Sequence, residues 1–209
     1  MLIEKDQLLP FEEAKLYGHN AIHTLMAYLG ALKGYTKMSE LRSDFAIMQI
    51  AREAFINESG AALIKKYSHL NDELFTEAGF KQYAEDLLER MTNPYLEDTI
   101  ERAGRDPVRK LGLNDRTFGT MTLCLERDIE PKNMALSGLA GVIFLLRRAR
   151  DNDLPDNLCF NHWGQINDTE ITEIMHWIWQ GKNNEYVDQL IKCVLTAKEK
   201  ICFVAGYRN

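Results

Sequence analysis

The sequence lacks the patterns that mark several large classes of protein. No apolar run approaches the ~20 residues that a membrane-spanning helix needs, and the first residues show no basic segment followed by an apolar one. The cysteines are Cys124, Cys159, Cys193 and Cys202, and none forms a C-x-x-C pair, which excludes a zinc ribbon and a thioredoxin-like motif. Reduced thiols in the cytoplasm are therefore the expected state and location.

The sequence also lacks an excess of positive charge. Its 25 basic and 31 acidic residues give a net charge of -6, so neither nucleic acid nor an anionic membrane is expected as a partner. Hydrophobic residues make up 45% and charged residues 27% of the 209 positions, which is typical of an ordinary globular protein. A chain of this length is expected to form a single domain, residues 1–209.

Strands, internal repeats and flexible linkers are missing as well. We find no segment that alternates apolar and polar residues as a strand does, and no Gly/Ser-rich stretch that would separate two domains. The spacing of apolar residues instead predicts an all-α fold. Helices are expected over residues 10–32, 39 to about 59–60, 61–67, 76–91, 95–104, 133–148, 169–179 and 184–204. A helical turn is also expected from Asp106 as N-cap, a further helix through Met121 and Leu125, and a polar loop over 149–167.

Three polar residues of the first predicted helix share one side of it. At about 100° per residue, Lys15, Asn20 and His23 fall within about 140° of one another. A lysine at the edge of a cleft can act as a base, while an amide and an imidazole can donate to a developing alkoxide or carbonyl oxygen. This combination suits hydride chemistry on an alcohol, and the alternative is a solvated helix face.

Five cations gather in a short stretch of this acidic chain. They are Arg102, Arg105, Arg109, Lys110 and Arg116, on either side of the Asp106-Pro107 pair that is expected to start a new helical turn. Guanidinium groups and an amine near the start of a helix are suited to binding an anion. A surface turn closed by salt bridges is the competing interpretation.

A metal site is not predicted. His19 and His23 are four residues apart and could share an ion, yet no third histidine, cysteine or carboxylate stands at a spacing typical of metal ligands. Gly18, between the lysine and the first histidine, is unusual inside a helix and could let a substrate or cofactor approach the backbone closely.

Both polar stretches resemble one family. The pattern K-x4-N-x2-H from Lys15 to His23, followed by residues 27–30 (A-Y-L-G) and 33–35 (K-G-Y), resembles the active-site signature of the mannitol dehydrogenase family, the polyol-specific long-chain dehydrogenases. Residues 104–111 (G-R-D-P-V-R-K-L), followed by D-R at 115–116, are similar to its mannitol-1-phosphate 5-dehydrogenase branch in particular.

The resemblance implies both a fold and a set of roles. It implies the multi-helix C-terminal domain of these enzymes, which is similar to the C-terminal domain of 6-phosphogluconate dehydrogenases. It assigns Lys15 as the catalytic base, and Asn20 and His23 as the side chains that polarise the substrate oxygen. The implied substrate-binding residues are Arg102 and Lys110 for the polyol, with Arg105 and Arg109 as candidates for a phosphate.

A nicotinamide cofactor needs a binding site that the sequence does not contain. No strand followed by G-x-G-x-x-G is present, and the nearest pattern, Gly138 to Gly141, lies in a predicted helix and reads as close helix packing. The resemblance implies NAD, bound mainly by an N-terminal Rossmann domain that is expected to be absent from this chain.

The predicted function follows from this combination. We expect the substrate-binding and catalytic part of a polyol or polyol-phosphate dehydrogenase, such as one that interconverts mannitol 1-phosphate and fructose 6-phosphate, and we expect it to be inactive alone. Its expected partners are the polyol or sugar phosphate and the missing nucleotide-binding domain. A non-catalytic helical module that docks on a separate nucleotide-binding protein remains the alternative.

Overall fold

The fold is built from helices and turns. The computed structural model describes residues 7–148, 154 and 167–204. Within these ranges it contains no strand, and its one isolated β-bridge pairs Lys37 with Thr99. The predicted all-α fold is therefore confirmed. In the same ranges, no helix has the length and apolar character needed to cross a bilayer.

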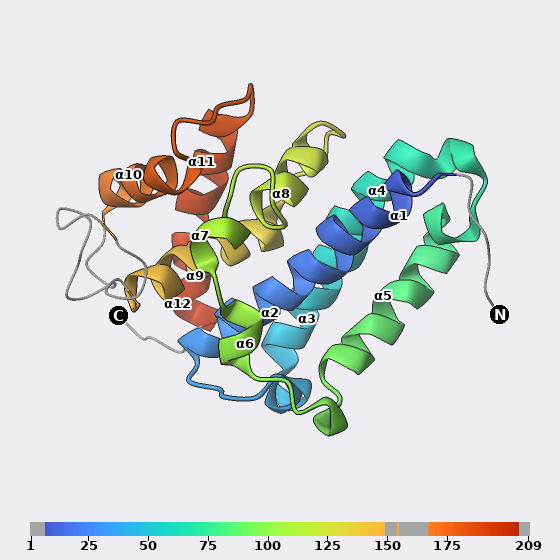
Figure 1. Cartoon of the computed structure of the whole chain (residues 1–209), viewed down its shortest axis with the longest axis horizontal. Helices are drawn as coiled ribbons and strands as arrows, with labels where there is room; N and C mark the ends of the chain where they lie inside the picture. Colours follow the sequence, from blue (N-terminus) through green and yellow to red (C-terminus); the bar gives the residue numbers. More distant parts are fainter. Residues whose placement is uncertain (1–6, 149–153, 155–166, 205–209) are drawn as a thin grey trace.

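Two long helical rods lie side by side at the centre of the molecule (Figure 1). Each contains a π-helical segment between two α-helical ones. The first rod consists of α1 (Leu9–Glu13), η1 (Ala14–Asn20) and α2 (Ala21–Leu32), and the second of α3 (Phe45–Glu53), η3 (Ala54–Gly60) and α4 (Ala61–Tyr67). The N–H of Ala21 bonds the carbonyl of Leu16, and that of Ala61 bonds Ile56, which are the i to i−5 bonds of a π turn.

The remaining helices pack on the two rods or on helix α9 (Lys132–Leu146), which itself lies against the first rod (Figure 1). Helix α5 (Glu77–Met91) packs on the second rod, whereas α9 packs on α2 and is itself contacted by α11 (Val187–Thr196) and α12 (Lys198–Val204). The other α-helices outside the rods are α6 (Ile100–Gly104), α7 (Pro107–Lys110), α8 (Phe118–Leu125) and α10 (Asp168–Trp179). Short 3-10 helices are η2 (Met38–Ser43), η4 (Ser68–Leu70), η5 (Glu73–Phe75) and η6 (Pro94–Leu96).

Helices α2 and α9 form the centre of the hydrophobic core. All of α2 is buried except His23 and Ala31, which are partly exposed. The two helices approach closely because α9 carries glycine at the contact, where a Cβ on Gly141 would lie 2.8 Å from Cε2 of Tyr28. The pattern from Gly138 to Gly141 is therefore close helix packing, as the sequence predicted.

The amino end of α9 is closed by a carboxylate from the second rod. Glu58, in η3, accepts hydrogen bonds from the backbone N–H groups of Asn133 at 2.7 Å and Met134 at 2.8 Å. Its side chain is buried, and burial raises its pKa although these hydrogen bonds oppose the shift. Glu58 thus satisfies donors that the first turn of a helix leaves free and connects η3 to the core helix.

Four sequence-based boundaries are wrong. The predicted helix 95–104 is divided, because Glu97 is left-handed (φ 48°) between η6 and α6. The second predicted helix does not end at residues 59–60, because Gly60 packs against the ring of Phe80 inside a π turn that continues into α4. Asp106 is no side-chain cap, since its backbone is left-handed (φ 61°) and its carboxylate bonds Arg109. The last helix is divided at Ala197, whose N–H also reaches the carbonyl of Val194 in a tightened turn. Most of the predicted loop 149–167 lies outside the described residues.

Candidate functional site

The first polar motif lies on the π turn of the first rod. Lys15 is exposed near the start of η1, Asn20 is partly buried at its end, and His23 lies in the first turn of α2. In a regular α-helix, two side chains five positions apart are separated by about 140° around the helix axis. A π turn closes with bonds between positions i and i+5, so η1 brings Lys15 and Asn20 close to the same side of the rod.

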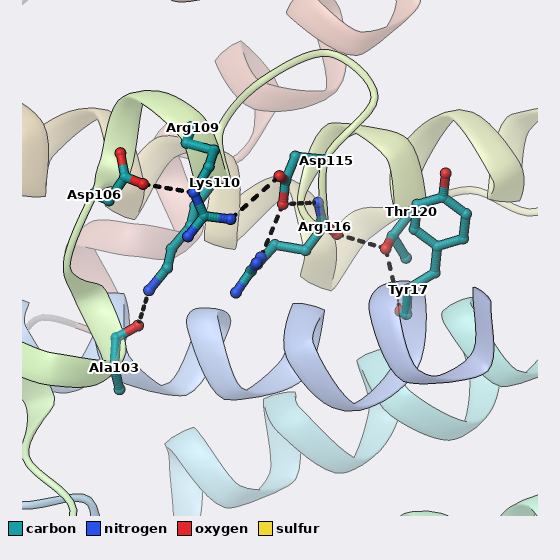
Figure 2. Close-up of polar contacts among 8 residues, drawn as sticks. All are labelled: Tyr17, Ala103, Asp106, Arg109, Lys110, Asp115, Arg116 and Thr120. Carbon is teal, nitrogen blue, oxygen red and sulfur yellow. Dashed lines mark hydrogen bonds and ion pairs between the residues drawn. The ribbon is translucent and has the colours of Figure 1, made fainter. Parts of the chain in front are cut away.

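The Tyr17 carbonyl of this π turn is held by two hydroxyl groups from other helices. The Ser59 hydroxyl donates to it at 2.7 Å from η3. The Thr120 hydroxyl, in α8, shares its one hydrogen between the Tyr17 carbonyl at 3.1 Å and the Arg116 carbonyl at 2.6 Å (Figure 2). Gly18 faces Phe55 in the core, where a Cβ would lie 3.1 Å from Cε2. The close approach expected at this glycine is therefore made by a side chain of the core.

His23 and Arg102 meet at one carboxylate. The Nε2 atom of His23 lies 2.9 Å from Oδ2 of Asp98, and Nε of Arg102 donates to Oδ1 of the same residue at 2.8 Å. The Asp98 side chain is only 8% exposed, whereas that of Arg102 is 66% exposed. The structure thus brings together one residue from each of the two sequence motifs. The sequence pattern alone does not predict this contact.

Lys110 is a buried amine near this pair. It is only 6% exposed and donates to the carbonyl of Ala103 at 2.6 Å (Figure 2). Burial, together with the nearby charges of Arg116 and Arg109, lowers the pKa of Lys110 to about 8. Its charge in turn acts on His23, whose pKa is lowered mainly by burial. Lys110, His23 and Arg102 therefore belong to one electrostatic neighbourhood.

The other cations of the second motif differ in how firmly they are held. Arg105 is exposed between α6 and α7. Arg109 donates to Asp106 at 2.5 Å and lies 3.6 Å from Asp115. Arg116 bonds Asp115 at 2.8 Å, is only 15% exposed and points, like the amine of Lys110, toward the first rod (Figure 2). The predicted surface salt bridges and the predicted cation cluster are thus both present.

The neighbouring imidazole of His19 is suited to staying neutral. Its pKa is lowered to about 4, first by burial and then by the charges of His23, Arg90 and Lys15. Its ring meets that of His23 edge to face, with centroids 6.2 Å apart. Among the described residues, no three His, Cys, Asp or Glu side chains are grouped as metal ligands would be.

Comparison with known proteins decides the family. The sequence profile of the mannitol dehydrogenase C-terminal domain matches residues 7–192. The chain belongs to this family. It is also 39% identical over 140 residues to a mannitol-1-phosphate 5-dehydrogenase from Caldanaerobacter subterraneus subsp. tengcongensis, an alignment that covers 66% of this chain and 34% of that protein. The chain therefore matches about a third of the length of this curated relative.

Several residues of this mannitol dehydrogenase C-terminal domain were not singled out by the sequence. Asp98 stands four positions before Arg102, a spacing that favours an ion pair on a helix. This spacing is the one feature of the sequence that points to Asp98. Ser59 and Thr120 are far from Lys15 in sequence, and no local pattern connects them to the π turn. Arg116 is one of the five cations of the second motif, and the family resemblance assigns it no role.

We expect the buried amine of this mannitol dehydrogenase C-terminal domain to make its stability depend on pH. The pKa of Lys110 is about 8 in the folded chain, against an ordinary 10.5, so between these values the unfolded chain binds more protons. The free energy of unfolding should therefore rise with pH across this window. Relative to Lys110→Met, the wild-type chain should gain up to about 3 kcal/mol.

Urea denaturation of both proteins from pH about 7 to about 10.5 measures this gain. Lys65→Met is the matched control, because Lys65 also donates to a backbone carbonyl, that of Arg127 at 2.8 Å, but is exposed. Parallel pH curves for the wild-type chain and Lys110→Met would contradict the expected effect.

Proposed function

We propose that this chain is the substrate-binding and catalytic domain of a polyol or polyol-phosphate dehydrogenase that interconverts mannitol 1-phosphate and fructose 6-phosphate or a related pair. The observation that carries the proposal is the meeting of His23 and Arg102 at Asp98. It joins the K-x4-N-x2-H motif to the cation motif, which lies about eighty positions further on. Membership of the family and the likeness to a mannitol-1-phosphate 5-dehydrogenase support the substrate class.

The proposed steps on this chain concern the substrate hydroxyl. Lys15, exposed on η1, accepts the proton of the hydroxyl that is oxidised, while Asn20 and His23 hold the oxygen. Arg102 and Lys110 bind the other hydroxyl groups of the polyol, because Arg102 presents an exposed guanidinium and Lys110 a buried amine. Arg105 and Arg109 bind the phosphate where one is present, with Arg109 exchanging its carboxylate partners for it.

The nicotinamide cofactor, NAD in this proposal, is assigned to a partner domain. In the part of the chain that the structure describes, the glycines of α9 do not form the glycine-rich turn that usually binds a dinucleotide. The space beside Gly138 is filled by Phe118, and the space beside Gly141 is filled by Tyr28. A Rossmann-type nucleotide-binding domain, in the same polypeptide or a separate one, is therefore the proposed partner. We expect the chain alone to be inactive.

The test is to supply such a domain, fused before residue 7 or added in trans, and to measure cofactor-dependent oxidation of mannitol 1-phosphate and of mannitol. Activity that needs both parts supports the proposal. If a folded fusion that binds NAD oxidises no polyol or polyol phosphate, the non-catalytic docking module becomes the better interpretation.

We predict that Arg105→Ala together with Arg109→Ala selectively weakens binding of phosphorylated substrates in the fused enzyme. A guanidinium contact to a phosphate contributes on the order of 1.5 to 3 kcal/mol, so its loss should raise KM by about ten- to a hundredfold. The KM values for mannitol and fructose should change far less. Arg42→Ala is the control, because Arg42 is an exposed arginine with only a loose 3.6 Å ion pair to Glu89. Equal effects on both substrate classes would remove the phosphate assignment and favour a free polyol or a sugar acid.

A further inference from the structure

Asp98 is a buried carboxylate whose two oxygens are both used by proposed substrate-binding side chains. Oδ2 faces Nε2 of His23 at 2.9 Å and Oδ1 accepts from Nε of Arg102 at 2.8 Å. The side chain of Asp98 is 8% exposed, against 22% for that of His23 and 66% for that of Arg102. The carboxylate therefore lies behind the two side chains, which are left to face the substrate.

The backbone around Asp98 is fixed on both sides. The N–H of Met38 donates to the Asp98 carbonyl at 2.9 Å, and that of Ile100 donates to Thr36 at 2.9 Å, around the bridge between Lys37 and Thr99. Thr99 then caps α6 by accepting from the N–H of Arg102 at 3.1 Å. The carboxylate is thus held independently of its two side-chain partners.

The ionisation of Asp98 decides which atom of His23 carries the hydrogen. Burial opposes ionisation of Asp98, but the hydrogen bond from Arg102 and the charges of His23 and Arg102 outweigh it and keep its pKa below the ordinary value. An ionised carboxylate can only accept, so Nε2 of His23 must donate. Burial lowers the pKa of His23, so near neutral pH its ring carries one hydrogen and Nδ1 is an acceptor.

We propose that Asp98 is a positioning residue that holds His23 in the Nε2–H tautomer and aims Arg102, so that His23 receives a substrate hydroxyl at Nδ1. This rests on the proposed function and changes one of its roles. His23 then accepts a hydrogen bond from a hydroxyl of the polyol, and donation to the reacting oxygen is left to Asn20. Because Asp98 takes Nε of Arg102, the two terminal nitrogens remain for substrate, and neither bonds any residue in the described part of the chain.

The variant Asp98→Asn tests the tautomer directly. An arginine has no acceptor, so the new amide must keep its oxygen on Arg102 and turn its NH2 group toward His23. His23 would then accept at Nε2 and carry its hydrogen on Nδ1. The ¹⁵N chemical shifts of labelled histidine in the chain at neutral pH report this directly, and His23→Gln identifies the signals.

We expect the Nε2–H form in the wild-type chain, the Nδ1–H form in Asp98→Asn and the Nε2–H form in Arg102→Met, which keeps the carboxylate. Asp44→Asn is the matched control, since Asp44 is also buried and accepts from the side chains of Lys33 and Tyr35 away from His23. An Nδ1–H or doubly protonated His23 in the wild-type chain overturns the proposal, even if Asp98→Asn fails to fold. So does an unchanged tautomer in folded Asp98→Asn.

Kinetics of the fused enzyme supply a second readout. Asp98→Asn should raise KM for the polyol by about ten- to a hundredfold and should lower kcat less, because Nδ1 of His23 can no longer accept from the substrate hydroxyl and Arg102 keeps only a neutral oxygen as its partner. A loss of kcat at unchanged KM contradicts a role in binding. The NMR measurement needs no activity, so failure of the fusion to oxidise polyols would count against the proposed function and leave the tautomer result intact.

Discussion

Replacing Lys15 with methionine is expected to lower kcat of the fused two-domain enzyme by about a hundred- to ten-thousandfold, the range that general base catalysis contributes. Methionine keeps the unbranched shape but cannot accept a proton. Lys15 is exposed on η1, so the change should leave folding intact and KM nearly the same. Absorbance of the reduced cofactor, followed with mannitol 1-phosphate as substrate, measures the loss.

Two further variants separate the chemistry from the surface charge. Lys81→Met removes an exposed lysine of α5 that belongs to neither sequence motif, and should leave kcat unchanged. Lys15→Ala leaves space for a small amine, so added ethylamine should restore part of the activity if a base is what is missing. Activity within about threefold of wild type in Lys15→Met, far short of the effect of losing a general base, would exclude Lys15 from that role.

The second large effect is expected from the pair of hydroxyls that hold the π turn. Ser59→Ala combined with Thr120→Val leaves the Tyr17 carbonyl without either side-chain donor. Each lost hydrogen bond contributes about 0.5 to 1.5 kcal/mol to stability, so without the two donors the turn can revert toward α-helical bonding. Such a shift would rotate Lys15 away from Asn20, and a misplacement of about 1 Å can lower kcat by about a hundredfold.

The two substitutions should be strongly non-additive. Either single variant leaves one donor on the carbonyl, so each should have much less than half the effect of the double variant on both unfolding free energy and kcat. Urea denaturation and kinetics of the four proteins complete the cycle. Thr92→Val is the control, because this buried threonine donates to the Leu88 carbonyl within α5. Additive effects would show that the hydroxyls do not act through a shared carbonyl.

The all-α fold was predictable because apolar spacing records which face of each helix is buried. The π turns were not, because their cause lies in other helices. Gly60 reads as a helix stop in sequence, but the ring of Phe80 occupies the space beside it and the helix continues. Gly18 likewise faces Phe55, which no local pattern reveals.

The candidate site was predictable in its residue types but not in its connections. The spacing K-x4-N-x2-H is a local property of the chain, as is the run of cations. That His23 and Arg102 would share Asp98 depends on the packing of α6 against α2. In the same way Arg109 could be recognised as a cation, yet its pairing with Asp106 and Asp115 appears only in the fold.

The bridge between Lys37 and Thr99 also closes a loop that contains the second rod and α5. Chain segments closed in this way tend to open as cooperative units, and amide hydrogen exchange detects such openings. Asp98 stands at the closure, with its carbonyl bonded to Met38 and its side chain in the candidate site. A substrate that binds His23 and Arg102 would therefore slow exchange in helices such as α5 that need not touch it. Protection far from the site thus becomes a reporter of its occupancy.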